Sequence, residues 1–162
     1  MKVEIYNVKN KNMKKAVLMM VMTGLVLVGF SQRQLPMSEY VVSDALYTEL
    51  SASQVEQMRS DNPAELIRMN YTMMNKAVVV FKLWDGNFQQ MGSLEQYLPA
   101  GMTYLEEEII QKGIVNPYKW NLPQDDYRYN VFKLRRNRAY VVVLPKTVLE
   151  ERIQAQLKSY VY

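Results

Sequence analysis

The sequence contains neither cysteine nor histidine. Their absence excludes a disulfide, a metal site built from thiolates or imidazoles, a cysteine nucleophile, a lipid-modified N-terminal cysteine and a Ser-His-Asp triad. The six glycines are too scattered to form a glycine-rich loop that would hold a phosphate or a dinucleotide. Any acid–base catalysis would therefore have to use Asp, Glu, Lys or Tyr.

An apolar run near the start of the chain is the clearest feature that is present. Two lysines precede residues 16–30, which are uncharged and mostly apolar. A basic start, a short apolar run and small residues at its end are typical of a secretory signal peptide. Gly29 and Ser31 are the small residues that would lie at positions −3 and −1 of a cut before Gln32.

Two other interpretations of this run are an uncleaved membrane anchor and a buried core helix. An uncleaved membrane anchor would be short, because 15 residues span about 22 Å of a hydrocarbon core of about 30 Å. A core helix would have a suitable length, but a surface helix of a small domain normally has a polar face, which this run lacks. We therefore expect residues 1–31 to be a cleaved signal peptide, with Met13 as an alternative start of translation. The protein is then exported to the periplasm or outside the cell, and only the signal segment contacts a membrane, before cleavage.

The charge of the chain depends on this leader. The whole sequence has a formal net charge of +4, with 20 basic and 16 acidic residues. Residues 1–31 hold five lysines and one glutamate, which leaves 15 residues of each sign in the rest. A neutral mature chain lacks the surplus of cations that phosphate contacts need, so no nucleic-acid partner is predicted.

Four helix-start signals follow in residues 32–162, which have the length of one domain. Three are capping boxes, in which a Ser or Thr and a Glu three residues later satisfy each other's backbone amides. They lie at Ser53/Glu56, Thr103/Glu106 and Thr147/Glu150. The fourth is Asn62 before Pro63, a pair that favours the N-cap and first position of a helix. The helices are expected to end near Ser60, Met74, Gly113 and the C-terminus.

Two pairs of β-branched and aromatic segments predict strands. Residues 77–84 and 87–91 flank Asp85-Gly86, a dipeptide that favours a two-residue hairpin turn. Residues 127–134 and 138–144 form the second pair, and the end of 138–144 is apolar on both faces, as in a central strand. The sequence therefore predicts an α+β fold, in which two β-hairpins form a small antiparallel sheet packed with about four short helices.

Two segments carry a resemblance to a known group of proteins. The lysine-led leader that ends in Phe30-Ser31-Gln32 resembles those of exported Bacteroidetes proteins. The stretch from Leu50-Ser51 through Asn62-Pro63 to Asn70-Tyr71 is similar to a segment in small uncharacterised exported proteins of that group. The resemblance implies export, and it implies no activity, cofactor or site residue.

Acidic residues cluster at two places. Glu106, Glu107 and Glu108 fall in the first turn of a predicted helix, where carboxylates offset the positive end of the helix dipole. A calcium or hydrolytic role is the alternative. Asp125 and Asp126 follow a proline, as in a turn, and a glycosidase-like carboxylate pair is the alternative. Neither cluster predicts a catalytic, metal or cofactor site.

Basic and aromatic residues give the candidate ligand or partner surface. Arg135, Arg136 and Arg138 lie at a predicted hairpin tip, where guanidinium groups could hold a phosphate, a sulfate or an acidic sugar. A solvated turn is the alternative. Tyr118 and Trp120 lie in a predicted loop, where aromatic faces stack on sugar rings or partner proteins, although they could equally belong to the core.

The sequence as a whole favours a non-enzymatic exported protein that binds or assembles with an envelope protein or a glycan. The alternative is a carbohydrate- or anion-binding module, and a carboxylate-based hydrolase is the least favoured. A broad apolar surface would indicate a protein partner, whereas a concave aromatic cleft with convergent polar groups would indicate a ligand. A hydrolase would need two carboxyl groups across such a cleft.

Overall fold

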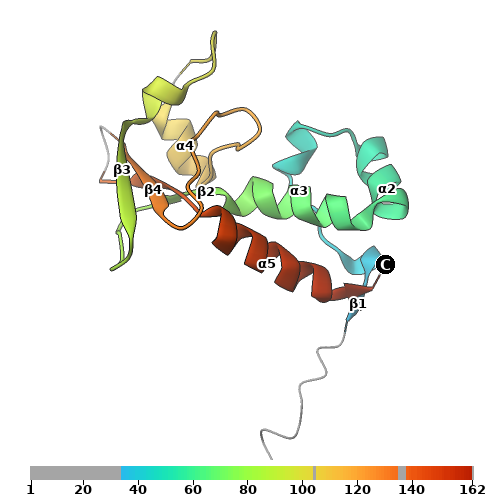
Figure 1. Ribbon diagram of the computed structural model, residues 1–162. Coiled ribbons are helices and arrows are strands. Elements are labelled where there is room, and N and C mark those ends of the chain that lie inside the picture. The colour runs from blue at the N-terminus through green and yellow to red at the C-terminus, as the bar shows by residue number, and fades with distance from the viewer. Residues whose placement is uncertain (1–33, 104, 135–137, 162) are drawn as a thin grey trace, which may run out of the picture. The chain divides into compact units, whose positions relative to one another are not determined.

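The computed structural model of the chain describes residues 34–103, 105–134 and 138–161. The predicted signal peptide and the arginines Arg135 and Arg136 lie outside the described residues. The described part combines helices with a four-stranded mixed sheet, so the predicted α+β class is confirmed (Figure 1).

The helices and strands alternate in blocks along the chain. The helices are α2 (Ala52–Asp61), α3 (Pro63–Asn75), α4 (Glu106–Lys112) and α5 (Lys146–Lys158), with short 3-10 helices η1 (Met37–Glu39), η2 (Leu46–Thr48) and η3 (Leu94–Tyr97). The strands are β1 (Leu35–Pro36), β2 (Ala77–Val80), β3 (Phe88–Ser93), β4 (Tyr129–Lys133), β5 (Tyr140–Val143) and β6 (Tyr160–Val161).

The order of strands in the main sheet is β2-β5-β4-β3. The predicted hairpin between β2 and β3 is therefore wrong, because these strands lie at opposite edges of the sheet. The predicted all-antiparallel sheet is also wrong, since β3 pairs with β4 in parallel. The apolar, buried strand β5 has a strand on each side, namely β2 and β4. Strand β3, in which Gln89 and Gln90 are exposed, lies at one edge of the sheet.

The second predicted hairpin is confirmed. Strands β4 and β5 pair antiparallel, with Phe132 opposite Val141. Residues 141–143 of β5 are buried, as the apolar pattern predicts for a central strand.

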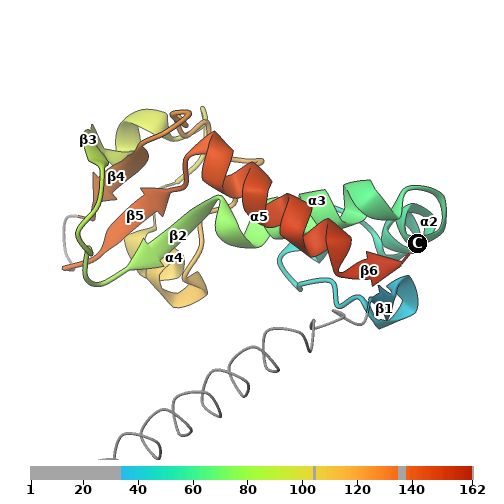
Figure 2. The same ribbon diagram turned by 60° about the horizontal axis from the view of Figure 1, so that its bottom comes forward.

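The two faces of the sheet pack against different elements. One face, with Val79, Phe132 and Val141, packs against residues of η3, α4 and the loop 113–122. Val78 and Tyr129 pack in a separate cluster with residues of α3 and α5, and Figure 2 shows these two helices running side by side. The first face is the one on which the candidate site is built.

Helices α2 and α3 begin at side-chain caps. The Asn62 side chain accepts a hydrogen bond from the Glu65 amide, with Pro63 in the first turn, so this predicted start is confirmed. The capping box of α2 is Ser51 with Gln54, so the predicted box at Ser53 is wrong by two residues. Both serines have an acceptor three residues on, and the earlier one adds residues to the helix.

Helices α4 and α5 begin without a side-chain cap, so both of their predicted capping boxes are wrong. The Thr147 hydroxyl donates instead to the Asp126 carbonyl at 2.7 Å. Glu150 forms a two-pronged ion pair with Arg68 of α3, which lowers the pKa of that carboxyl to about 2. At α5, distant partners thus take the side chains that would have formed the local cap. The end of α4 at Gly113 is confirmed, and its φ of 70° is one that glycine favours.

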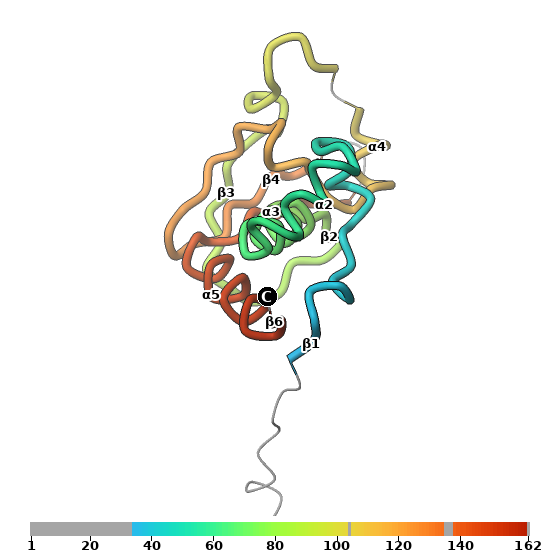
Figure 3. The backbone as a smooth tube through the Cα atoms, turned by 90° about the vertical axis from the view of Figure 1, so that its right-hand side faces the viewer, coloured from blue at the N-terminus to red at the C-terminus, as the bar shows by residue number. Residues whose placement is uncertain are grey.

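A second hydrophobic cluster lies among α2, α3 and residues 37–50, with Leu46, Val55 and Leu66 fully buried. At the other side of this cluster β1 pairs in parallel with β6, and Figure 3 shows the two short strands next to each other. The first and last strands of the described chain are therefore tied together.

Within the part of the chain that the structure describes, none of the helices has the length and apolar character needed to cross a membrane.

Candidate functional site

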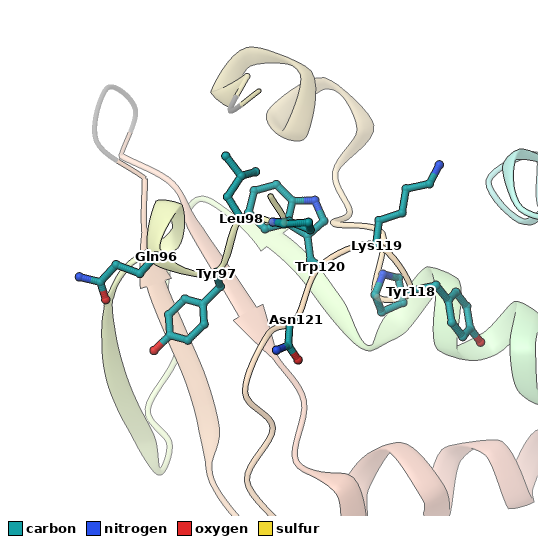
Figure 4. A pocket seen from close by; sticks show the side chains of 9 residues that line it. Gln96, Tyr97, Leu98, Tyr118, Lys119, Trp120 and Asn121 are labelled. Atoms are coloured by element: carbon teal, nitrogen blue, oxygen red, sulfur yellow. The ribbon is translucent and has the colours of Figure 1, made fainter. Parts of the chain in front are cut away.

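A groove of about 450 Å³ lies where two loops meet beside the first face of the sheet. We call it the aromatic groove. Its described lining residues are Gln96, Tyr97, Leu98, Pro99, Pro117, Tyr118, Lys119, Trp120 and Asn121. Figure 4 shows Tyr97 and Asn121 directed to the same side, Leu98 and Trp120 together at the other, and Tyr118 apart from them near α3. The volume lies within the range of about 300–1,000 Å³ that is common for small-molecule sites.

The first wall of the groove comes from η3 and the residues after it. Leu94 is buried in the core beneath the sheet face and fixes the start of this turn. Tyr97 packs edge-on against Phe132 of β4, with the ring centroids 5.2 Å apart. Because Phe132 is fully buried, it gives the Tyr97 ring a rigid backing.

The second wall is the loop 116–121, which Asn116 organises. The Asn116 carbonyl oxygen of the side chain accepts hydrogen bonds from the amides of Tyr118 and Lys119, as in an Asx turn. Its amide donates to Glu49 at the end of η2, 2.7 Å away. The loop is thereby held in one conformation by both its own side chain and the helical part of the fold.

Tyr118 and Trp120, which the sequence analysis selected, both line this groove, but they differ in exposure. Trp120 is only 8% exposed and belongs to the core cluster, so it forms a floor and offers little of its face. Tyr118 is 46% exposed, and its hydroxyl donates to the Met69 carbonyl at 3.2 Å. Burial raises the pKa of this phenol, which stays neutral. Tyr118 therefore presents a fixed ring to solvent.

Lys119 is the one charged residue among the described residues of the lining. Its Nζ lies 2.8 Å from Glu49 Oε1, the same oxygen that accepts from Asn116. The interaction with Lys119 and, to a smaller extent, the hydrogen bond from Asn116 lower the pKa of Glu49. The carboxylate therefore stays ionised at neutral pH. The cation of the groove is thus already balanced within the protein.

Arg138 is the member of the predicted arginine cluster that the structure describes, and it is not part of the groove lining. Arg138 is exposed, while Arg135 and Arg136 lie outside the described residues. The structure thus brings together the two predicted aromatics, and it does not bring Arg138 to them.

The two acidic clusters lie in the local structures expected for them, the first turn of a helix and a turn between elements. Glu106 to Glu108 form the first turn of α4, with Glu106 buried and Glu108 paired with Lys112 four residues on. The Asp125 side chain accepts from the amides of Tyr127 and Arg128, as in a turn. Asp126 pairs with Lys146 at 2.9 Å. No group of three or more His, Cys, Asp or Glu residues suited to a metal ion occurs among the described residues.

A second aromatic cluster lies away from the groove. Trp84 contacts Phe88 and Tyr129 edge-on, with ring centroids 5.2 and 5.6 Å apart. Trp84 is 47% exposed and Tyr127, two residues before β4, is 76% exposed. Trp84, Phe88 and Tyr129 thus pack together at the start of β3 and β4, and neither they nor Tyr127 belong to the described lining of the aromatic groove.

Sequence reasoning missed half of the groove. Gln96, Tyr97 and the residues after them were not singled out, nor was the pairing of Lys119 with Glu49. One sequence signal could have indicated the first wall, because Tyr97-Leu98-Pro99 and Pro117-Tyr118 each place a tyrosine within two residues of a proline.

No protein-family model, curated protein or solved structure matches this chain.

Proposed function

We propose that the chain is an exported cell-envelope protein that acts by binding a ligand in the aromatic groove, without catalysis. The groove is the observation that carries this proposal. It is concave, it contains three aromatic residues, and its lining also includes the polar side chains of Gln96, Lys119 and Asn121. That combination is typical of a ligand site and differs from the broad apolar surface of a protein–protein interface.

A hydrolytic role receives less support from the same residues. Hydrolysis of a glycan needs an acid and a nucleophile or base, normally two carboxyl groups about 5–10 Å apart. The described lining of the groove includes neither Asp nor Glu. Glu49 is not part of this lining, and its carboxylate is engaged in the ion pair with Lys119.

Export remains part of the proposal. It rests on the basic and apolar leader in residues 14–31 and on the resemblance of residues 50–71 to exported Bacteroidetes proteins. Processing before Gln32 would leave a net charge of zero, which suits a protein that binds by shape and hydrogen bonding.

The test is a thermal-shift panel on protein purified from cells that express the full chain. The panel contains neutral oligosaccharides, acidic oligosaccharides and short peptides. We expect at least one class to raise the melting temperature, since saturation at 100 times Kd stabilises the native state by about 2.7 kcal/mol. Tyr118→Ala should weaken that binding about tenfold, or about 1.4 kcal/mol, because it removes the exposed ring.

The matched control is Tyr127→Ala, which removes an exposed tyrosine outside the groove. It should leave the ligand response unchanged. A ligand response that Tyr118→Ala preserves and Tyr127→Ala abolishes would refute the groove as the site.

A further inference from the structure

We propose that the ligand of the aromatic groove is a neutral oligosaccharide of two or more sugar rings. This inference rests on the proposed function and adds the chemical class and the length of the ligand. It is carried by the charge balance at Lys119, by the two side-chain amides and by the placement of two tyrosines, the partly buried Tyr97 and the exposed Tyr118.

The charge balance disfavours an anionic ligand. Lys119 is paired with Glu49 at 2.8 Å, and the Glu49 side chain is only 21% exposed. An acidic sugar or a phosphate that took Lys119 would leave this half-buried carboxylate without its cation, which costs free energy. It would also lie close to the Glu49 charge. A neutral ligand leaves the pair intact.

The remaining polar side chains suit sugar hydroxyls. Gln96 and Asn121 are exposed at the groove, and each amide offers both donors and an acceptor. A hydroxyl group also donates and accepts, so each amide can hold a pair of neighbouring hydroxyls. Figure 4 shows that Asn121 and the Tyr97 ring point to the same side of the groove, so one sugar ring can meet an amide and an aromatic ring together.

The two tyrosines indicate more than one ring. Tyr97 is backed by Phe132, whereas Tyr118 is held at α3 through the Met69 carbonyl. Trp120 and Asn121 lie between them in Figure 4. A single pyranose cannot stack on both, but a chain of sugar rings can place an apolar face on each.

The experiment measures affinity by calorimetry for neutral gluco-, manno- and xylo-oligosaccharides of one to six rings and for oligogalacturonate. For the wild type we expect at least one neutral series to bind, with affinity rising about tenfold from one ring to three, which corresponds to about 1.4 kcal/mol. Oligogalacturonate should not bind. Tyr97→Ala and Tyr118→Ala should each flatten this length dependence.

The Glu49→Gln variant tests the charge argument directly. Without the carboxylate, Lys119 is free to meet an anion, so the variant should gain salt-sensitive binding of oligogalacturonate. The double variant Glu49→Gln/Lys119→Gln should lose that gain. Glu151→Gln, which removes the same charge from an exposed position on α5, is the matched control and should gain nothing. If Glu49→Gln does not fold, the wild-type comparison of neutral and acidic sugars still decides.

The outcomes separate this inference from the proposed function. Binding of a peptide, or of the acidic sugar by the wild type, that Tyr118→Ala weakens would overturn the inference and leave the groove as a binding site. Binding of a single sugar ring as tightly as of a chain would overturn the length argument. A response from no member of the panel would overturn both proposals.

Discussion

Replacing Asn70 by alanine is expected to lower the free energy of unfolding by about 2–4 kcal/mol. Asn70 of α3 is only 8% exposed. Its side-chain oxygen accepts from the amide and the hydroxyl of Ser43, at 3.0 and 2.6 Å. Its amide donates to the Tyr40 hydroxyl at 2.8 Å and to the Val41 carbonyl at 3.3 Å. The truncation removes four hydrogen bonds at once and leaves several partly buried polar groups unpaired.

Urea unfolding measures this loss, and Asn75→Ala is the matched control. Asn75 lies at the end of the same helix and makes one hydrogen bond, to the Tyr71 carbonyl. It should cost about 1 kcal/mol or less. Equal losses for the two variants would mean that Asn70 does not fix residues 40–43 on α3.

Replacing Phe132 by alanine should cost about 3–5 kcal/mol, the range for removing a buried aromatic side chain. Phe132 is a fully buried residue of β4, on the sheet face that packs against η3. Its loss also removes the ring against which Tyr97 packs. We therefore expect weaker ligand binding in the groove as well as lower stability.

Two further substitutions serve as comparisons for the stability loss of Phe132→Ala. Phe132→Leu keeps most of the apolar volume and should cost about 1.5 kcal/mol or less. Phe88→Ala removes a half-exposed aromatic ring from the edge strand β3, and it should cost clearly less than Phe132→Ala. Thermal or urea unfolding that ranks Phe88→Ala at or above Phe132→Ala would contradict the assignment of the core.

Local signals predicted the fold where no distant partner competes with them. Asn62 and Pro63 start α3 as expected, and the apolar pattern of residues 141–144 identifies the central strand β5. The first hairpin failed because Asp85-Gly86 is a local signal. Strand β2 pairs instead with the buried strand β5, and the paired residues are at least 60 positions apart in the sequence. A rule for local turns cannot detect such a pairing.

At the start of α5, contacts with distant segments likewise prevail over a local signal. Thr147 and Glu150 have the spacing of a capping box, yet each contacts another segment of the chain. An ion pair with Arg68 joins two helices, which a contact within one turn cannot do. Tertiary contacts therefore decide how these side chains are used.

The sequence predicted one of the two walls of the candidate site, because the other wall and the ion pair depend on tertiary contacts. The aromatic character of Tyr118 and Trp120 is visible in the sequence, although only the structure shows that Trp120 is a floor and Tyr118 an exposed ring. Tyr97 and Gln96 reach the groove because the same sheet face supports both loops, which no local pattern encodes. The pairing of Lys119 with Glu49 spans 70 residues and was equally hidden.

The central claim is that residues 96–99 and 117–121 form the ligand site, and amide NMR mapping tests it most directly. A titration of the isotope-labelled protein with the neutral oligosaccharides should move the amide signals of these two segments and of Glu49 beside them. The signals around Trp84 and Arg138 should stay in place. Shifts that centre on Trp84 or on Arg138, with the groove signals unchanged, would contradict the account.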